Sequence, residues 1–284
     1  MYVITGITGQ VASALARNLL AAGKEVRAVV RDAAKGETWQ AQGCSVAVAD
    51  MQDRVALTRA FQGATAVFVL LPPNFDPRPD FPETRAILAN LHAALLASQP
   101  ERVVCLSTVG AQASHPNLLS QLGEMEHVLG QLPMPITFLR AAWFMENSLW
   151  DIAPAREHGV LYSFLQPLDK PVHMVATADV GRVAAQLLQE PWEGVRVVEL
   201  TGPQAISPLQ LAATLGQVLG REVKAQAVPR DSWEALFLEQ GMENPVPRMQ
   251  MLDGFNAGWI DFEGAPRQAR TDLQTVLAGL VERS

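Results

Sequence analysis

The sequence is poor in cysteine, in lysine and in long uninterrupted runs of one residue type. Its two cysteines, Cys44 and Cys105, lie at or in strand-like segments, which argues against a disulfide framework and favours a reducing, cytoplasmic setting. No basic run occurs and the net charge is −7, which argues against direct binding of nucleic acid or of an anionic membrane surface. No apolar run is long enough for a membrane span, and the strand-like MYVIT at the start predicts no signal peptide.

Several catalytic and metal-binding motifs are missing as well. The chain contains no G-x-S-x-G elbow, no H-E-x-x-H, no cysteine pair at zinc spacing and no G-x-x-x-x-G-K-[ST]. The five histidines are scattered along the chain, at His92, His115, His127, His158 and His173. The sequence therefore predicts no metal centre.

The residues that are present predict a globular α/β protein. Hydrophobic residues make up 49% of the 284 positions and charged residues 18%, a balance typical of a folded chain with one large domain or one domain plus an appendage. Apolar, unbroken strands are expected at 2–5, 25–30, 45–49, 66–71, 102–106 and 136–139, and helices at 10–22, 33–42, 53–61, 83–98 and 117–132. Strands of this kind are covered on both faces, so the pattern predicts a doubly wound, parallel Rossmann-like sheet with helices on both faces.

The regular alternation of strand-like and helix-like segments ends after Arg140, which predicts a smaller α+β C-terminal lobe. A short strand pair is expected at 160–164 and 172–174, a helix over 175–190 and a strand at 196–200. Ser207 followed by a proline predicts the start of a helix over 207–219. We expect a dinucleotide-binding domain at 1–148, to which 176–202 returns, and a substrate or partner lobe formed by 149–175 and 203–284.

The first strand ends in a glycine turn, G-x-x-G-x-x-A, that opens the first helix. Gly6 allows a tight turn, Gly9 lets the backbone approach a phosphate, and Ala12 lets the helix pack closely on the strand. A dinucleotide pyrophosphate would dock at this helix N-terminus. The alternative is a glycine turn that serves packing alone.

The end of the second strand bears on the choice between NAD(H) and NADP(H). An enzyme that prefers NAD usually has an acid there, whereas this chain has Arg31 there and Lys35 one turn later. Both side chains could pair with a 2′-phosphate, which favours NADP(H), although Asp32 could still accept from a hydroxyl and a solvated charge cluster is the alternative. Asp50 and Met51 follow the third strand, where an acid can accept from an adenine amino group and a methionine can pack on the ring.

The segments GITGQVA, VVRDAAK, VADMQD, STVGAQ, FLRAAWFMEN and TADVGRVAAQLL, in this order, resemble the NmrA-like family of atypical short-chain dehydrogenase/reductase relatives. The resemblance covers nearly the whole chain. It implies a Rossmann-like domain, a smaller lobe and a cleft between them. The residues that it implies for NADP(H) are Gly6, Thr8, Gly9, Gln10, Val11, Arg31, Lys35, Asp50, Met51, Leu71, Pro72, Ser107 and Thr108.

The resemblance also implies where an acceptor would lie and what it could be. On this basis the substrate side is expected at Trp143, Phe144 and Asn147, although Trp143 and Phe144 could instead be core between the lobes. Leu122 is a further substrate-side candidate from its place on the helix after the fifth strand. Phe75 is another, if the loop FDPRPDF is a lid and not a proline-stiffened surface loop. Members of the family include quinone reductases, dye reductases and non-catalytic sensors of NADP(H) that bind a protein partner. A small-molecule acceptor and a protein partner are therefore both expected classes, and a monomer and a homodimer both stay open.

The helix after the fifth strand lacks the Tyr-x-x-x-Lys pair of ordinary short-chain dehydrogenases. The tyrosines are Tyr2 and Tyr162, no lysine lies between 36 and 169, and Leu122 stands where some relatives keep a lysine or histidine. A tyrosine-driven reaction on ketones is therefore not expected. His115 is the remaining candidate for a proton donor, with a plain loop residue as the alternative, and Glu124 and Glu126 are expected to be solvated.

Three functions fit this pattern. The first is an NADPH-dependent reductase of quinones or similar conjugated acceptors, whose reduced oxyanion needs little help because its pKa is about 10, like that of tyrosine. The second is an NADP(H) sensor that binds a protein partner without turnover. The third is an isomerase or epimerase of nucleotide sugars, against which the missing Tyr-Lys pair counts.

Overall fold

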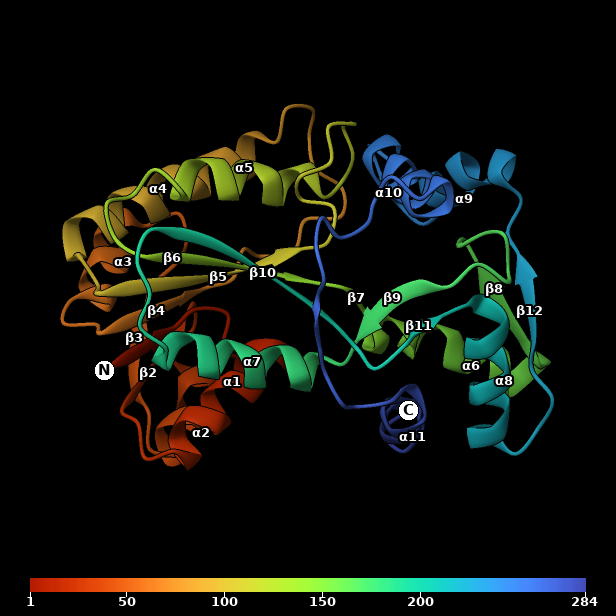
Figure 1. Cartoon of the computed structure of the whole chain (residues 1–284), viewed down its shortest axis with the longest axis horizontal. Helices are drawn as coiled ribbons and strands as arrows, with labels where there is room; N and C mark the ends of the chain where they lie inside the picture. The colour runs from red at the N-terminus through yellow and green to blue at the C-terminus, as the bar shows by residue number, and fades with distance from the viewer.

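The computed structural model describes all residues from Met1 to Ser284 and is built on one eight-stranded parallel sheet (Figure 1). The strand order is β13-β10-β6-β5-β4-β1-β2-β3. The sheet strands are β1 Tyr2–Ile4, β2 Val26–Val30, β3 Ser45–Val48, β4 Ala66–Val69, β5 Arg102–Thr108, β6 Ile136–Ala141, β10 Val195–Thr201 and β13 Arg267–Gln268. The order reverses between β1 and β4, which is where a doubly wound sheet forms its ligand crevice. The predicted Rossmann-like fold is confirmed.

Six helices cover the two faces of this sheet. Figure 1 shows α1, α2 and α7 on one face and α3, α4 and α5 on the other. Their bounds are α1 Gln10–Ala21, α2 Ala34–Ala41, α3 Arg54–Phe61, α4 Pro82–Ser98, α5 Ser120–Leu129 and α7 Thr177–Gln189. Helix α3 begins after Asp53, whose carboxylate accepts from the amides of Val55 and Ala56 and so satisfies two orphan donors of the first turn.

The rest of the chain forms two small sheets with seven helices around them. The strands are β7 Trp143–Phe144, β8 Val160–Ser163, β9 Val172–Val175, β11 Ala205–Ile206 and β12 Lys224–Ala227. The helices are η1 Met145–Asp151, α6 Ile152–His158, α8 Pro208–Leu219, η2 Arg230–Ser232, α9 Trp233–Glu239, α10 Val246–Ala257 and α11 Leu273–Val281. Ser207 caps α8 in a reciprocal capping box with Gln210, as its sequence predicts.

The expected strand pair at 160–164 and 172–174 is wrong in its pairing. Both strands exist, but β8 pairs in parallel with β12, and β9 pairs with β11 and β7. A local sequence pattern marks a strand without naming its partner, and the partners here lie about thirty to sixty residues away along the chain.

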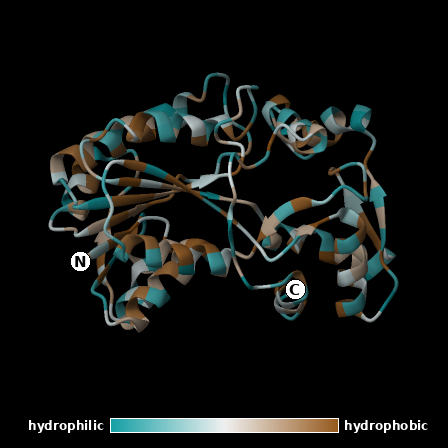
Figure 2. Ribbon diagram, viewed as in Figure 1, coloured by the Kyte–Doolittle hydropathy of each residue, from teal (hydrophilic) through white to brown (hydrophobic).

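Buried apolar side chains form three clusters, one on each face of the large sheet and one in the smaller sheets and their helices. Figure 2 shows the strands of the large sheet mostly in the hydrophobic colour. Cys44 and Cys105 are both buried free thiols, as expected, and burial raises the pKa of each, with the charge of Glu126 adding to the rise at Cys105. None of the helices combines the length and the apolar character that a bilayer crossing requires.

Helix α7 comes back from the smaller lobe and packs along α1. Gly181 makes this contact possible, because a β-carbon there would lie 2.5 Å from the carbonyl oxygen of Val11 and 2.7 Å from the amide nitrogen of Leu15. Strand β10 then pairs with β6. The division of the chain into a domain at 1–148 and a separate smaller lobe stays a prediction.

Candidate cofactor and acceptor site

The glycine turn between β1 and α1 leaves an open helix N-terminus. Gly6 has φ +65°, a left-handed conformation that glycine adopts at little cost, and a β-carbon there would press on Leu70 at 3.1 Å. Gly9 is the N-cap of α1 and no side chain caps the helix. The amides of Gln10, Val11 and Ala12 donate to no protein acceptor, so they remain available to an anion. The turn therefore fits a dinucleotide pyrophosphate.

Of the three charged residues that follow β2, two are unpaired cations and one is an acid with a local hydrogen bond. Arg31 and Lys35 are exposed and neither makes an ion pair, whereas the Asp32 carboxylate accepts from the amide of Ala34 at 3.0 Å and faces the start of α2. Two cations stand free at the crevice end that would hold the ribose. These cations could hold a 2′-phosphate, and the preference for NADP(H) over NAD(H) stays a prediction.

The residues after β3 are held by local hydrogen bonds. Asp50 accepts from the amide of Gln52 at 2.8 Å and is exposed, while Met51 is 8% exposed and packs in the core on the α3–α4 side. The Asn90 side chain donates to the carbonyl of Met51 at 3.2 Å. Met51 thus packs in the core and Asp50 keeps one carboxylate oxygen for a ligand, while the roles of both at an adenine ring stay predictions.

Strand β4 ends in a long loop that reaches the smaller lobe. Leu71 is half-buried, Pro72 is exposed, and Phe75 is 62% exposed. The carboxylate of Asp76 accepts from the amides of Glu243 and Asn244, both at 2.7 Å, just before α10. The loop is therefore tied across the space between the lobes, while the role of Phe75 at the acceptor stays a prediction.

Strand β5 ends in two hydroxyl residues whose protons point into the protein. Ser107 is 4% exposed and donates to Glu126 Oε1 at 2.5 Å, and Thr108 donates to the carbonyl of Val109 at 3.1 Å. The expectation that Glu126 is solvated is wrong: its side chain is 12% exposed and lies over the sheet. Glu124, two residues earlier, pairs with Arg85 on the outside of α5.

The reason for the burial of Glu126 is Arg140 on β6. The Arg140 guanidinium donates to both oxygens of Glu126, at 2.9 and 2.7 Å, and its third nitrogen donates to Glu263. Burial alone would lower the pKa of Arg140, but the hydrogen bonds to Glu126 and Glu263 raise it well above its usual value. Glu199 on β10 completes the group, with an oxygen 3.9 Å from Arg140.

Glu199 also holds a segment of the smaller lobe against the sheet. Its two oxygens accept from the amides of Glu263 and Gly264, both at 2.9 Å. Nearby, Ile260 fills the space beside Gly110, where a β-carbon would lie 2.6 Å from it. Residues 260–264 thus cross the carboxyl ends of β5, β6 and β10. Sequence reasoning missed this group, although charged residues inside the apolar strands ITFLRA and VVELT were the available signal.

Helix α5 carries no acid or base at the position expected for one. Leu122 is half-buried and packs against the core cluster on this face of the sheet. His115, in the loop before α5, is exposed and its ring lies 4.9 Å from that of Trp259. The roles of Leu122 beside an acceptor and of His115 as a proton donor stay predictions.

The segment after β6 joins the two lobes through its side chains. Trp143 meets Phe255 of α10 edge to face at 5.2 Å between ring centroids, and Phe144 packs on the α1–α7 side of the sheet. Asn147 is exposed and Trp150 is 84% exposed. Trp143 and Phe144 are therefore packed at the join between the lobes, and their contact with an acceptor stays a prediction.

Two acids in this region accept hydrogen bonds near the start of α7. Glu146 accepts from the amide of Thr177 and, at 2.6 Å, from its hydroxyl, which also lies 3.1 Å from Gln10 Oε1. Burial would raise the pKa of Asp179, but hydrogen bonds from Arg182 and Thr271 outweigh it and lower that pKa. Glu146 thus holds the start of α7 beside the open end of α1, and Asp179 joins α7 to the backbone of Arg270 and Thr271.

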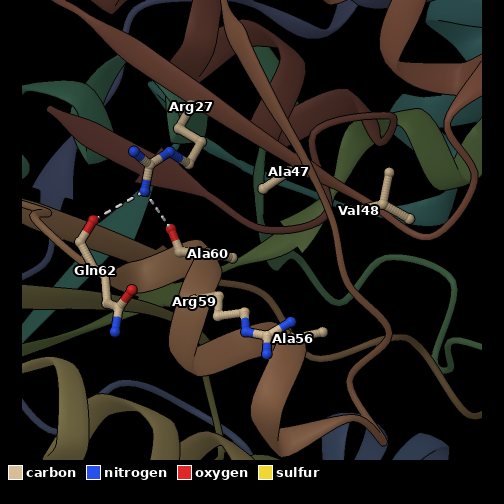
Figure 3. Close-up of a pocket in the computed structure, with 7 residues that line it drawn as sticks. All are labelled: Arg27, Ala47, Val48, Ala56, Arg59, Ala60 and Gln62. Carbon is tan, nitrogen blue, oxygen red and sulfur yellow. Dashed lines mark hydrogen bonds between the residues drawn. The ribbon is translucent and has the colours of Figure 1, made fainter.

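A separate pocket lies at the outer edge of the sheet beside β3 (Figure 3). Arg27 points into it and donates to the carbonyls of Ala60, in the last turn of α3, and of Gln62, its C-cap, at 2.8 and 2.9 Å. Its guanidinium therefore already has partners. The pocket contains none of the residues predicted for the cofactor or the acceptor.

The likeness to known proteins extends over the whole of this architecture. Residues 2–261 match the NmrA-like family. The chain belongs to the NmrA-like family. Among its curated relatives are an NAD(P)H azoreductase of Xenophilus azovorans, 30% identical over 85% of this chain and 82% of the relative, and quinone oxidoreductase 2 of Escherichia coli, 29% identical over 88% and 85%.

A solved structure of the family resembles this NmrA-like chain along nearly its full length. It is the NADPH-dependent quinone oxidoreductase of Escherichia coli complexed with NADPH, which is 26% identical, with a TM-score of 0.78 over 99% of this chain and 95% of that one. The family and the fold predicted from the sequence are thus both confirmed.

Proposed function

We propose that this protein is an NADPH-dependent oxidoreductase that reduces quinones or similar conjugated acceptors without a Tyr-Lys pair. The observation that carries the proposal is the open N-terminus of α1, with unpaired amides at Gln10, Val11 and Ala12, on a chain that is similar throughout to an NADPH-binding quinone oxidoreductase. The names of the two curated relatives support a nicotinamide cofactor and a flat, conjugated acceptor.

The preference for NADPH rests on the charges after β2. Arg31 and Lys35 are free cations at the ribose end, and Asp32 is occupied by the amide of Ala34. A 2′-phosphate would gain charge-assisted hydrogen bonds there that a hydroxyl could not match. When bound, NADPH supplies a hydride, which is two electrons and one proton.

The acceptor class follows from the donors that the site lacks. No tyrosine or lysine lies on α5, and the hydroxyls at the end of β5 donate inward. An acceptor that takes the hydride and becomes a stabilised, phenolate-like anion can then take its second proton from water, because its pKa is about 10. A simple ketone would become an alkoxide that this site does not stabilise.

The direct test mixes the protein with NADPH and a panel of quinones in a stopped-flow instrument and follows the absorbance of the reduced nicotinamide. Saturable oxidation, faster with NADPH than with NADH, is the expected result. Tight NADPH binding with no oxidation by any quinone would reject the reductase and favour an NADP(H) sensor that binds a protein partner. The absence of a tyrosine and a lysine from α5 is the observation that favours that second function.

A further inference from the structure

The hydroxyl proton of Ser107 has a fixed direction in this structure. Its oxygen lies 2.5 Å from Glu126 Oε1, and that carboxylate receives two further hydrogen bonds from Arg140. An ionised carboxylate can only accept, so the proton in the Ser107–Glu126 hydrogen bond must belong to the serine. Ser107 therefore offers its lone pairs, and no proton, to a molecule at the end of β5.

The surroundings keep Glu126 in this role. Arg140 holds it through two parallel N–H donors, a geometry that fixes a carboxylate in position as well as stabilising it. Arg140 itself is only 6% exposed and faces Glu126, Glu199 and Glu263 together. Because one guanidinium faces three carboxylates, no unpaired cation remains beside Ser107 to favour donation of its proton to a bound molecule.

We infer that Glu126, oriented by Arg140, is a specificity-determining positioning residue: it turns the Ser107 hydroxyl into a hydrogen-bond acceptor and so excludes acceptors that need a proton donor at their oxygen. This inference rests on the proposed reductase function and names its acceptor class. Quinones and other conjugated acceptors remain substrates, whereas simple ketones and aldehydes do not. The lone pairs of Ser107 suit an N–H donor such as a carboxamide.

The first test is Ser107→Ala, assayed with NADPH and menadione. We expect the Kd for NADPH to rise by up to about tenfold, the effect of losing one hydrogen bond to the carboxamide, and kcat at saturating NADPH to fall by less than about tenfold, because a hydroxyl that donates to Glu126 gives no proton to the transition state. A hydroxyl that does stabilise developing negative charge costs about a hundred- to a thousandfold in kcat when it is removed. A loss of kcat of that size, with the melting temperature unchanged, would overturn the inference.

The second test is Glu126→Ala, with Glu124→Ala on the same helix as the matched control. Alanine removes the acceptor of the Ser107 proton and so leaves that proton for the acceptor molecule, while Arg140 keeps Glu199 and Glu263 as partners. We expect the ratio of kcat/KM for cyclohexanone to that for menadione to rise about tenfold, the effect of one added hydrogen bond. The control and the double variant Ser107→Ala/Glu126→Ala should show no rise, and an unchanged ratio in Glu126→Ala itself would refute the assignment.

A neutron crystal structure of the deuterated protein decides the proton's position without any turnover. A deuteron on Ser107 Oγ that points to Glu126 supports the inference, and one that points away from Glu126 overturns it. If the wild type fails to oxidise NADPH with any quinone, the proposed function fails, yet the neutron map still shows whether Glu126 holds the serine proton.

Discussion

Gly181 offers a quantitative test of the contact that places α7 against α1. A β-carbon at this position would lie 2.5 Å from the Val11 carbonyl oxygen, 2.7 Å from the Ala14 β-carbon and 2.7 Å from the Leu15 amide nitrogen. Carbon atoms in contact normally lie about 3.5–4.0 Å apart, so the two helices would have to separate by about 1 Å. Two of the three atoms belong to the backbone and cannot turn aside.

The expected effect of Gly181→Ala is the balance of two terms. Alanine in place of glycine inside a helix stabilises by about 1 kcal/mol. Overpacking costs about 1–3 kcal/mol, and the rigid backbone atoms of α1 place this site near the top of that range. We expect a net loss of about 1–2 kcal/mol in the free energy of unfolding, measured by urea denaturation.

Gly279→Ala in α11 is the matched control, because the nearest atom to its added β-carbon is Arg283 Nη1 at 3.7 Å. This variant should gain about 0.5 kcal/mol from helix propensity alone. Gly181→Ala should also raise the Kd for NADPH roughly tenfold, the effect of losing about one hydrogen bond to an anion when the first turn of α1 shifts. A Gly181→Ala protein as stable as the wild type would refute the tight packing of α7 on α1.

Three further predictions concern single side chains. Burial raises the pKa of Asp151 from 3.8 to about 7, so the folded state prefers the neutral acid and loses stability as pH rises from about 4 to about 7. Asp151→Asn should therefore stabilise the protein by up to about 4 kcal/mol at pH 8 and by little at pH 4. Equal gains in urea denaturation at the two pH values would contradict this. Arg31→Ala should weaken NADPH binding about tenfold or more and NADH binding little, as measured by fluorescence titration, and an equal loss would remove Arg31 from the 2′-phosphate site. Leu122→Lys should cost roughly 1–2 kcal/mol of unfolding free energy because Leu122 packs on the core, and an unchanged melting temperature would place it toward the acceptor instead.

The local chemistry of this chain could be predicted from its sequence. Apolar strands that alternate with helices specify a parallel sheet, since each pattern reports its own periodicity and burial. The glycine turn at Gly6 and the cap at Ser207 are equally local, because each depends on residues within one or two turns. The same locality explains why Arg31 and Lys35 could be named as cofactor candidates from their place after the second strand.

The group around Ser107 could not be predicted in the same way. Glu126 looked like a surface residue because its neighbour Glu124 is one, and only the hydrogen bonds that Glu126 accepts from Arg140 of β6 set the two apart. Arg140 inside an apolar strand did signal that some buried acid must exist, yet it could not say which. The partners come from positions 14 and 123 residues away along the chain, so only the tertiary structure could bring them together.

The sequence by itself determined the Rossmann-like fold and the family and named the residues proposed for the cofactor, because those depend on periodicity and on short motifs. The tertiary structure alone decided the strand partners of the smaller lobe, the burial of Glu126 and the direction of the Ser107 proton. These features depend on which distant segments pack together. The role of a buried charged group depends on the protein atoms that replace its hydrating water.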